Sequence, residues 1–306
     1  MRVYRVPAAV IGTAIVMAMT SCSASTASPG SGPVLAVAAE NEYASVLAQV
    51  GGRYVRVSAI ESNPNTDPHS FEASPSVART VAAAQLIVQN GIGYDSYMTK
   101  IENGSPNSTR KIITVQRLLR LPDSTPNPHL WYSPRTMPAV AKAIAADLAQ
   151  LRPAHTAYFR SRAAAFDRSL RPWLAALAQF KARYGGTPVA VTEPVADYML
   201  QAAGASIRTP FAFQAEIMND TDPAPQYVSL QERLFARHQV KVFLYNQQVT
   251  DSITASFLAA ARRYHIPVVG VYETMPTPGY NYQSWMLAEI TALRKAVTAK
   301  ASTEKL

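Results

Sequence analysis

Short apolar segments of strand length alternate with stretches of helical periodicity along most of the chain. The first half has four such apolar segments, VLAVAAE, YVRVSAI, LIVQN and IITV. Each is followed by a helical pattern, and these patterns lie near residues 43–50, from 74, near 94–101 and over 133–151. Strands that alternate with helices build parallel sheets covered on both faces. The pattern therefore predicts an α/β lobe over residues 34–150.

Residues 151–183 carry no strand signal, but their apolar side chains recur at helical spacing: Phe159, Phe166, Leu170, Trp173, Leu174 and Leu177. A continuous helix over residues 154–183 would measure about 45 Å at roughly 1.5 Å per residue. Pro172 favours a kink within it. We expect this segment to be one long helix that links two lobes.

The second half restarts the alternation of strands and helices. Helices are predicted near 194–203, 225–237, 252–264 and 283–299, and the strands are VAVTE, VKVFLYN and PVVGVYE. The predicted fold class is therefore α/β, with two α/β lobes and parallel sheets joined by one long linking helix. The C-terminal lobe spans residues 184–306.

Ligand-binding residues are expected at the carboxyl ends of the predicted strands, because open α/β sheets bind ligands at that edge. Glu193 ends the first strand of the second half, and Glu273 ends the last. Taken singly, each is also compatible with an ordinary polar strand end.

The N-terminal segment has the composition of a secretory signal. Arg2 and Arg5 precede an apolar run over 8–19 that is too short to span a bilayer, which predicts a signal peptide over residues 1–21. Thr-Ser-Cys22 resembles the lipobox of bacterial lipoproteins, so residues 22–33 are expected to form a flexible tether lipidated at Cys22. Plain secretion, with Cys22 idle, is the alternative. Cys22 is the only cysteine, so no internal disulfide can form.

Composition and charge exclude several classes of function. Apolar residues make up 48% and charged residues 16%, a globular balance. Removing Arg2 and Arg5 lowers the formal charge from +9 to +7, and the remaining cations are scattered, which does not indicate nucleic-acid binding. HExxH, GxSxG and Walker motifs are absent, so no common enzyme signature is present.

Pro-His occurs twice, in NTDPHSFEASP and in NPHLWYSP, each time followed by Ser-Pro. Ser-Pro predicts a helix start, with Ser74 and Ser133 as N-caps and proline at the first helical position. His69 and His129 are therefore expected in loops that the preceding prolines stiffen. Such loops suit metal ligation, although a single loop histidine is also typical of a surface residue.

Two histidines and two carboxylates would balance the charge of a divalent cation. His69, His129, Glu193 and Glu273 are the candidates for this set. No function is assigned to the other three histidines, His155, His238 and His265. His155 is expected to open the linking helix. His238 and His265 are expected in the last turns of helices, where a cation complements the helix dipole.

Taken together, the motifs resemble those of the solute-binding lipoproteins of zinc and manganese ABC importers, also called cluster A-I binding proteins. The resemblance covers Val34 to Lys300 and rests on DPHSFEASP, VARTVAAAQLIVQNGIGYDSYM, NPHLWYSP, VAVTEPVADYML, IPVVGVYETMP and YQSWM in that order. It implies two lobes joined by a rigid helix. It also implies a metal held between them by His69, His129, Glu193 and Glu273.

Two positions depart from the usual family pattern. The third ligand is often histidine in zinc binders and glutamate in some manganese binders, so Glu193 is compatible with either metal. The fourth is usually aspartate, whereas this chain has Glu273; Asp220, Asp222 and Asp251 are alternatives. Residues 100–126 lack the histidine-rich loop of many zinc-specific members. The resemblance therefore implies Zn²⁺ or Mn²⁺.

The resemblance further implies a bacterial, extracytoplasmic protein that is lipid-anchored to the cell membrane, monomeric and not an enzyme. It would deliver its metal to a cognate ABC permease in the cytoplasmic membrane and bind no nucleic acid. One alternative is a surface adhesin with a structural metal. Another is a metal-dependent hydrolase, which would need an open coordination position and a general base.

Overall fold

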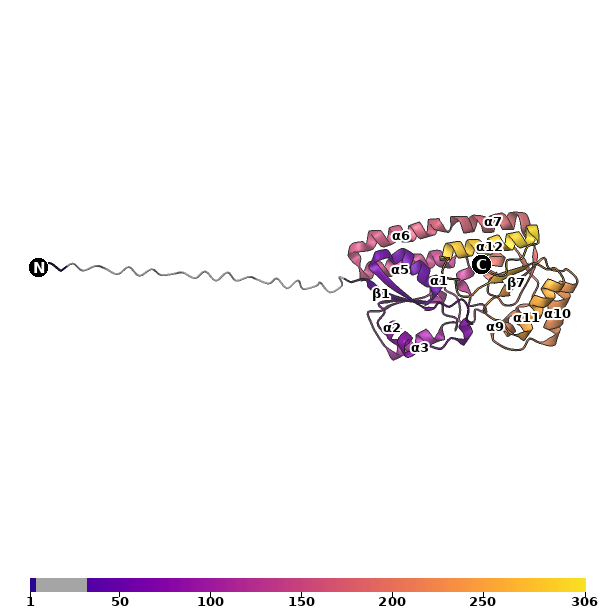
Figure 1. Cartoon of the computed structure of the whole chain (residues 1–306), viewed down its shortest axis with the longest axis horizontal. Coiled ribbons are helices and arrows are strands. Elements are labelled where there is room, and N and C mark those ends of the chain that lie inside the picture. Colours follow the sequence, from indigo (N-terminus) through magenta and orange to yellow (C-terminus); the bar gives the residue numbers. More distant parts are fainter. Residues whose placement is uncertain (4–31) are drawn as a thin grey trace. The chain divides into compact units, whose positions relative to one another are not determined.

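Two parallel β-sheets organise the part of the chain that the computed structural model describes, which is residues 1–3 and 32–306. Within residues 32–306, each sheet forms a lobe with helices on its faces (Figure 1). The predicted signal peptide beyond residue 3, Cys22 and most of the predicted tether lie outside the described residues. Among the helices of the described part, none is long and apolar enough to cross a membrane.

The N-terminal lobe consists of β1 (Val34–Glu40), α1 (Asn41–Gly51), β2 (Val55–Glu61), α2 (Pro75–Ala82), β3 (Leu86–Gln89), α3 (Ser96–Gly104), β4 (Lys111–Thr114), α4 (Val115–Leu118) and α5 (Thr136–Leu151). The strand order is β2-β1-β3-β4, and all neighbours are parallel. Alternate residues of a strand face opposite sides. Ala36 and Ala38 accordingly pack with α1 and α5, whereas Val37 and Ala39 pack with α2 and α3.

The C-terminal lobe consists of β5 (Pro188–Val191), α8 (Asp197–Ala202), β6 (Ser206–Ile207), α9 (Phe211–Met218), α10 (Pro225–Ala236), β7 (Val242–Asn246), α11 (Ser252–Arg263), β8 (Val268–Val271) and α12 (Tyr282–Ala299). Its order, β6-β5-β7-β8, repeats that of the first sheet, again with parallel neighbours. Strand β7 is buried on both faces. One face packs against α9, α10 and α11, and the other joins the core of the N-terminal lobe.

Two consecutive helices, α6 (Thr156–Ser169) and α7 (Arg171–Tyr184), connect the lobes and run along the same edge as α12 (Figure 1). The expected single linking helix is two helices, interrupted at Leu170 close to the kink expected at Pro172. Pro172 lacks an N–H and cannot donate to the carbonyl four residues earlier, which explains the break. The predicted apolar stripe is buried except for Leu174, which is 38% exposed.

The predicted fold class of two α/β lobes with parallel sheets is confirmed. Three helices or strands escaped the sequence analysis: the short helix α4, the two-residue strand β6 and helix α9. Strands β5 and β8 stop two residues before Glu193 and Glu273, so both glutamates lie just beyond the strand ends.

Candidate metal centre between the lobes

The loop that carries His69 is fixed at both of its ends. Asp67 caps the 3-10 turn η2 (Pro68–Ser70), and its Oδ1 accepts the backbone N–H of His69 at 2.8 Å. Ser74 caps α2, with Pro75 at the first helical position, so the predicted Ser-Pro helix start is confirmed here. The His69 side chain remains 26% exposed, which leaves it accessible from solvent.

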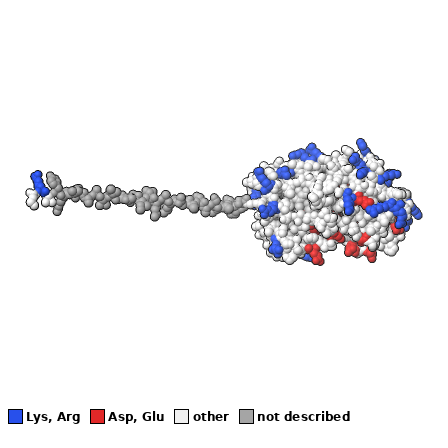
Figure 2. Space-filling model, in the orientation of Figure 1, with Lys and Arg blue, Asp and Glu red and all other residues white. Residues whose placement is uncertain are grey.

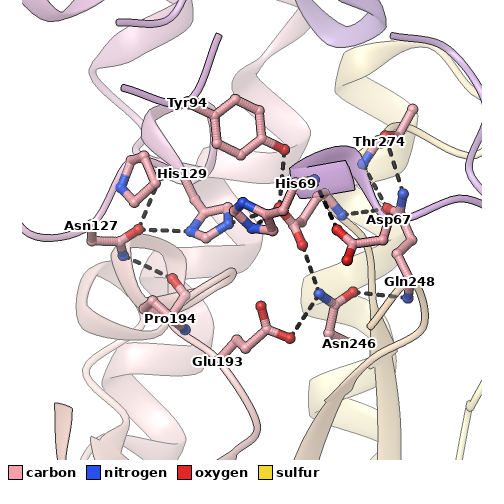
Figure 3. Close-up of polar contacts among 12 residues, drawn as sticks. Asp67, His69, Tyr94, Asn127, His129, Glu193, Pro194, Asn246, Gln248 and Thr274 are labelled. Atoms are coloured by element: carbon pink, nitrogen blue, oxygen red, sulfur yellow. Dashed lines mark hydrogen bonds and ion pairs between the residues drawn. The ribbon is translucent and has the colours of Figure 1, made fainter. Parts of the chain in front are cut away.

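Asn127 sets the orientation of the buried His129 ring. Its Oδ1 accepts the backbone N–H of His129 at 3.0 Å and lies 2.8 Å from Nδ1. Because a carbonyl oxygen only accepts, Nδ1 carries a proton, and Nε2 of the neutral ring presents a lone pair. The Asn127 amide nitrogen donates to the carbonyl of Pro194 at 2.8 Å, which ties this loop to the opposite lobe (Figure 3).

The second Ser-Pro pair does not begin a helix, contrary to the prediction. Helix α5 starts at Thr136, with Arg135 at the N-cap position, while Ser133 and Pro134 form a turn. The backbone N–H of Thr136 donates to the carbonyl of Ser133 at 3.1 Å. The buried 3-10 turn η3 (Leu130–Tyr132) precedes this turn and delays the helix.

Glu273 lies at the centre of the polar contacts between the lobes. Its Oε2 is 3.2 Å from Nε2 of His69 and 3.1 Å from Nε2 of His129. The hydroxyl of Tyr94 donates to the same oxygen at 3.0 Å. Ligand atoms of the two histidines and Glu273 all fall within 4.8 Å of one another. The structure thus brings three of the four predicted site residues together.

Glu193 lies beside this cluster and is connected to it through Asn246 (Figure 3). The Asn246 amide nitrogen donates to Oε1 of Glu193 at 3.1 Å and to Oε1 of Glu273 at 2.8 Å. Both glutamates are buried, with exposures of 2% and 1%. Oε2 of Glu193 is buried without a hydrogen-bond partner, a costly state that a cation would relieve.

The contact between His129 and Oε2 of Glu273 also favours a cation at the site. With Nδ1 of His129 protonated, its Nε2 lone pair faces a carboxylate oxygen, and this contact is repulsive unless a proton or a cation lies between them. Imidazole nitrogens and carboxylate oxygens are the donors that zinc and manganese accept. The donor set therefore fits a divalent transition metal.

The pKa values of the cluster reflect strong mutual interaction. Burial opposes protonation of His69, but the hydrogen bond to Glu273 and the charge of that residue prevail and raise the pKa of His69 to about 9. Burial lowers the pKa of His129 despite the same carboxylate. Burial would raise the pKa of Glu273, but its hydrogen bonds with the two histidines hold it well below its usual range.

Burial, reinforced by the charge of Glu273, raises the pKa of Glu193 well above its usual range. A buried carboxyl beside another carboxylate ionises reluctantly in the absence of a cation. A divalent ion placed among these groups would reverse that cost.

The alternative acids lie away from the cluster. Asp251 caps α11 by accepting the N–H of Thr254 at 2.6 Å, and Asp220 and Asp222 are exposed in the segment after α9. None of the three belongs to the group of converging metal-type donors found among the described residues.

The other three histidines also lie outside the cluster. His155 ends a 3-10 turn and stacks on Tyr54, with ring centroids 3.8 Å apart. His238 and His265 were expected in last helical turns, but they lie two residues past α10 and α11 with φ values of 50° and 55°. Their backbone N–H groups close these helix ends by donating to carbonyls three residues earlier.

Sequence reasoning missed four residues that shape the site: Tyr94, Asn127, Asn246 and Gln248. Asn246 ends a predicted strand, so the strand-end rule that selected the glutamates could have found it. Gln248 Oε1 accepts the backbone N–H of Glu273 at 2.7 Å, while its amide nitrogen donates to the carbonyl of Thr66 at 2.7 Å. These amides position the ligands across the lobe boundary.

A cavity of about 540 Å³ leads to His69 and Tyr94 from outside. It is lined by both lobes, with Asp123 from the first and with Phe211 and Met218 from the second. Acidic side chains gather along the lower edge of the folded body in Figure 2, whereas lysine and arginine occupy much of the upper edge. An acidic edge raises the local concentration of cations.

Two α/β lobes with a buried cluster of imidazole and carboxylate donors between them define a two-lobed binding protein whose site suits a metal. The chain belongs to the ZnuA family, described as "Zinc-uptake complex component A periplasmic", whose model matches residues 37–296. The predicted resemblance to zinc and manganese solute-binding proteins is thereby confirmed.

Among known proteins, the chain is 23% identical over 161 residues to the manganese-binding lipoprotein MntA of Bacillus subtilis (strain 168). This alignment covers 50% of the chain and 52% of MntA, so the chain spans about half the length of that relative.

Two solved structures share the fold. The Mn-bound S38A mutant of a periplasmic metal binding protein from Candidatus Liberibacter asiaticus has a TM-score of 0.70 and 17% identity, covering 86% of this chain and 99% of that one. A mutant of the laminin-binding adhesin Lmb from Streptococcus agalactiae has a TM-score of 0.72 and 18% identity, covering 87% and 100%.

Proposed function

We propose that the protein is the extracytoplasmic metal-binding subunit of an ABC importer. It captures Zn²⁺ or Mn²⁺ between its lobes and delivers the ion to a membrane permease. The observation that carries this proposal is the convergence of His69, His129 and Glu273 at the lobe boundary. Glu193 supplies the fourth ligand through its unpartnered Oε2.

The charge balance supports a transported ion as the occupant. Two neutral imidazoles and two carboxylates cancel the charge of a divalent cation, so the filled site is neutral and tolerates burial. Four protein ligands also leave no open position for a reactive water, which argues against a metal-dependent hydrolase.

Attachment to the membrane is proposed to occur through a lipid on Cys22. The lipobox-like sequence at Cys22 supports this, and the relative MntA is described as a lipoprotein. In a Cys22→Ala variant, the protein should move from the membrane fraction to the soluble fraction, because acyl chains supply the anchoring energy of ~0.8 kcal/mol per buried CH₂. Unchanged membrane association would contradict the anchor.

The adhesin alternative has one specific observation in its favour, the structural similarity to Lmb. Exchange separates the two functions, because a carrier releases its ion without unfolding, whereas a structural ion leaves only as the protein unfolds. Chelator competition followed by circular dichroism measures this. Metal removal with the fold retained supports transport, and coupled unfolding supports a structural metal.

The proposal is tested by titrating metal-stripped protein from Ser23 onward with ZnCl₂ and with MnCl₂ in a calorimeter. We expect one saturable site per molecule for at least one of the two ions. Failure of both ions to bind near unit stoichiometry would overturn the proposed function.

A further inference from the structure

Asn246 holds one oxygen of each buried carboxylate in the site. It is 0% exposed at the end of β7, and its amide nitrogen contacts Oε1 of both Glu193 and Glu273. We propose that Asn246 limits each glutamate to one ligand oxygen and so selects a four-coordinate ion, Zn²⁺, over Mn²⁺. This inference rests on the proposed function and names its cargo.

The orientation of the Asn246 amide is fixed by its other contacts. Its Oδ1 accepts the backbone N–H of Gln248 at 3.0 Å, so the nitrogen must point toward the carboxylates. The backbone N–H of Asn246 donates to Oγ1 of Thr192 at 3.0 Å, one residue before Glu193. The side chain is therefore locked by strand β7 and by the neighbouring strand end.

The other oxygen of each glutamate is not bonded to Asn246. Oε2 of Glu273 points at both imidazoles, and Oε2 of Glu193 is buried without a partner. One nitrogen from each histidine and one oxygen from each glutamate make four donors. Four N and O donors suit the tetrahedral preference of Zn²⁺, whereas Mn²⁺ favours about six donors, mainly oxygen.

Loss of the amide donor frees both Oε1 atoms for bidentate binding. The ligand count could then rise from four to six without any new residue. Asn246 would thus act as a positioning residue that touches the glutamates and not the metal. Residues of this kind typically change metal affinity by about 10–100-fold.

The test compares Asn246→Leu, which keeps the volume but removes the donor, with wild type. Dissociation constants for Zn²⁺ and Mn²⁺ are measured by calorimetry. The coordination number of each bound ion is measured by X-ray absorption. We expect Zn²⁺ affinity to fall by about tenfold or more while Mn²⁺ affinity holds or rises, and we expect more donors around the bound ion in the variant.

The matched control is Gln231→Leu, which removes another buried amide of the same lobe. Gln231 donates to the carbonyl of Val191 at 3.1 Å and does not contact the glutamates. Its loss should lower the melting temperature without changing the ratio of the Mn²⁺ and Zn²⁺ dissociation constants. A similar change of that ratio in both variants would overturn the inference.

Wild-type measurements keep the inference testable even if Asn246→Leu fails to fold. Four donors around Zn²⁺ in wild type support it, and six donors overturn it while leaving the proposed function intact. If wild type binds neither ion, the proposed function itself has failed. If Asn246→Leu folds and keeps the wild-type affinity ratio, only the role of Asn246 is refuted.

Discussion

The two lobes share one sheet topology but contribute different chemistry to the site. Both sheets have the order 2-1-3-4 when their strands are numbered within the lobe. The N-terminal lobe supplies imidazoles from loops, and those loops need residues such as Asp67 and Asn127 to hold the histidines in place. The C-terminal lobe supplies carboxylates directly beyond β5 and β8. Strand ends are rigid supports, whereas loop ligands depend on the residues that brace them.

The contact between the lobes differs on the two sides of the site. The back is the side of α6, α7 and α12, and the front is the side of the ligand loops. One continuous apolar cluster at the back includes residues of both sheets, of α6 and α7, and of α12. Each large side chain buried there contributes roughly 1.5–3 kcal/mol. At the front, the contacts are polar, such as the bond from Gln248 to Thr66. The shared core opposes separation of whole lobes, so exchange of the ion should rely on the loops.

The largest effect is expected from the C-terminal lobe, in a Glu273→Ala variant. Glu273 contacts both histidines, Tyr94 and Asn246, so its loss removes a ligand and leaves an uncompensated charge on the ion. We expect metal affinity to fall by about a thousandfold or more, because removing a residue that binds the ion directly costs more than the 10–100-fold typical of supporting residues. Calorimetric titration measures this. Wild-type affinity in Glu273→Ala, together with loss of binding in Asp222→Ala or Asp251→Ala, would show that the fourth ligand is one of those acids.

The next largest effects on metal affinity are expected from the N-terminal ligand variants His69→Ala and His129→Ala. Each removes one nitrogen donor but no charge, so we expect a loss of about a hundredfold, smaller than that for Glu273. His155→Ala is the matched control, since its ring stacks on Tyr54 outside the site. Equal losses in the control and in the two site variants would contradict the assignment.

A smaller effect is expected when only the brace of an N-terminal ligand is removed. Asn127→Ala frees the His129 ring from the contact at Nδ1, and such supporting contacts are worth about 10–100-fold in metal affinity. The variant should bind more weakly than wild type but more tightly than His129→Ala. Binding as weak as that of His129→Ala, with the fold intact, would mean that Asn127 is itself a ligand.

Much of the fold could be predicted because its signals are local. Strand-length apolar runs and the stripe from Phe159 to Leu177 mark the sheets and the linking helices directly. Pro172 marked the interruption at Leu170 in advance, because proline lacks the backbone N–H that a helix needs. Strand β6 has only two residues, too few for a periodic pattern. The second Ser-Pro pair resembled a helix start, but it forms a turn after a buried 3-10 turn, and α5 begins only at Thr136.

Only part of the candidate site could be predicted from the sequence, and the limit differs from that of the fold. The repeated Pro-His pairs and the strand-end rule pointed to the ligands, and the family resemblance joined them into one set. Asn246 ends a predicted strand, but an asparagine in sequence does not show which partner it meets across the fold. Asn246 contacts a glutamate 53 residues away. Asn127 lies two residues before His129, and its bond to the opposite lobe is visible only in the structure.

Proton release should distinguish the two imidazoles of the N-terminal lobe. Glu273 raises the pKa of His69 to about 9, so the metal-free ring is charged near neutral pH and must lose a proton to bind an ion. Burial lowers the pKa of His129, which is already neutral. We expect metal binding near pH 7 to release the His69 proton, and this share of the release should fade above about pH 9, as measured by calorimetry in buffers of different ionisation enthalpy. Burial also raises the pKa of Glu193, so its carboxyl adds to the release as it binds the ion. A release that does not decline above about pH 9 would contradict a charged His69.

The smallest effect concerns the shared core behind the site, where Glu289 of α12 meets Tyr132 of the N-terminal lobe. The Tyr132 hydroxyl and the Trp285 ring nitrogen donate to Oε1 of Glu289 at 3.2 Å and 3.0 Å. Burial raises the pKa of Glu289 from 4.5 to about 8. The folded protein therefore keeps a proton that the unfolded chain loses above its ordinary pKa. The stabilisation from this group is complete below about pH 4.5 and is lost as pH rises to about 8.

Glu289→Gln keeps the shape and the acceptor oxygen but does not titrate. We therefore expect the free energy of unfolding of wild type, relative to this variant, to fall by about 1 kcal/mol or more between about pH 5 and about pH 8. Urea denaturation of both proteins across this range measures the difference, and other buried acids cancel in the comparison. Metal affinity should stay unchanged in Glu289→Gln, because the residue supports the back of the lobe boundary and not the ligands. A pH-independent difference between the two proteins would show that Glu289 is ionised in the folded core, and the lobe boundary would then have to contain a compensating charge.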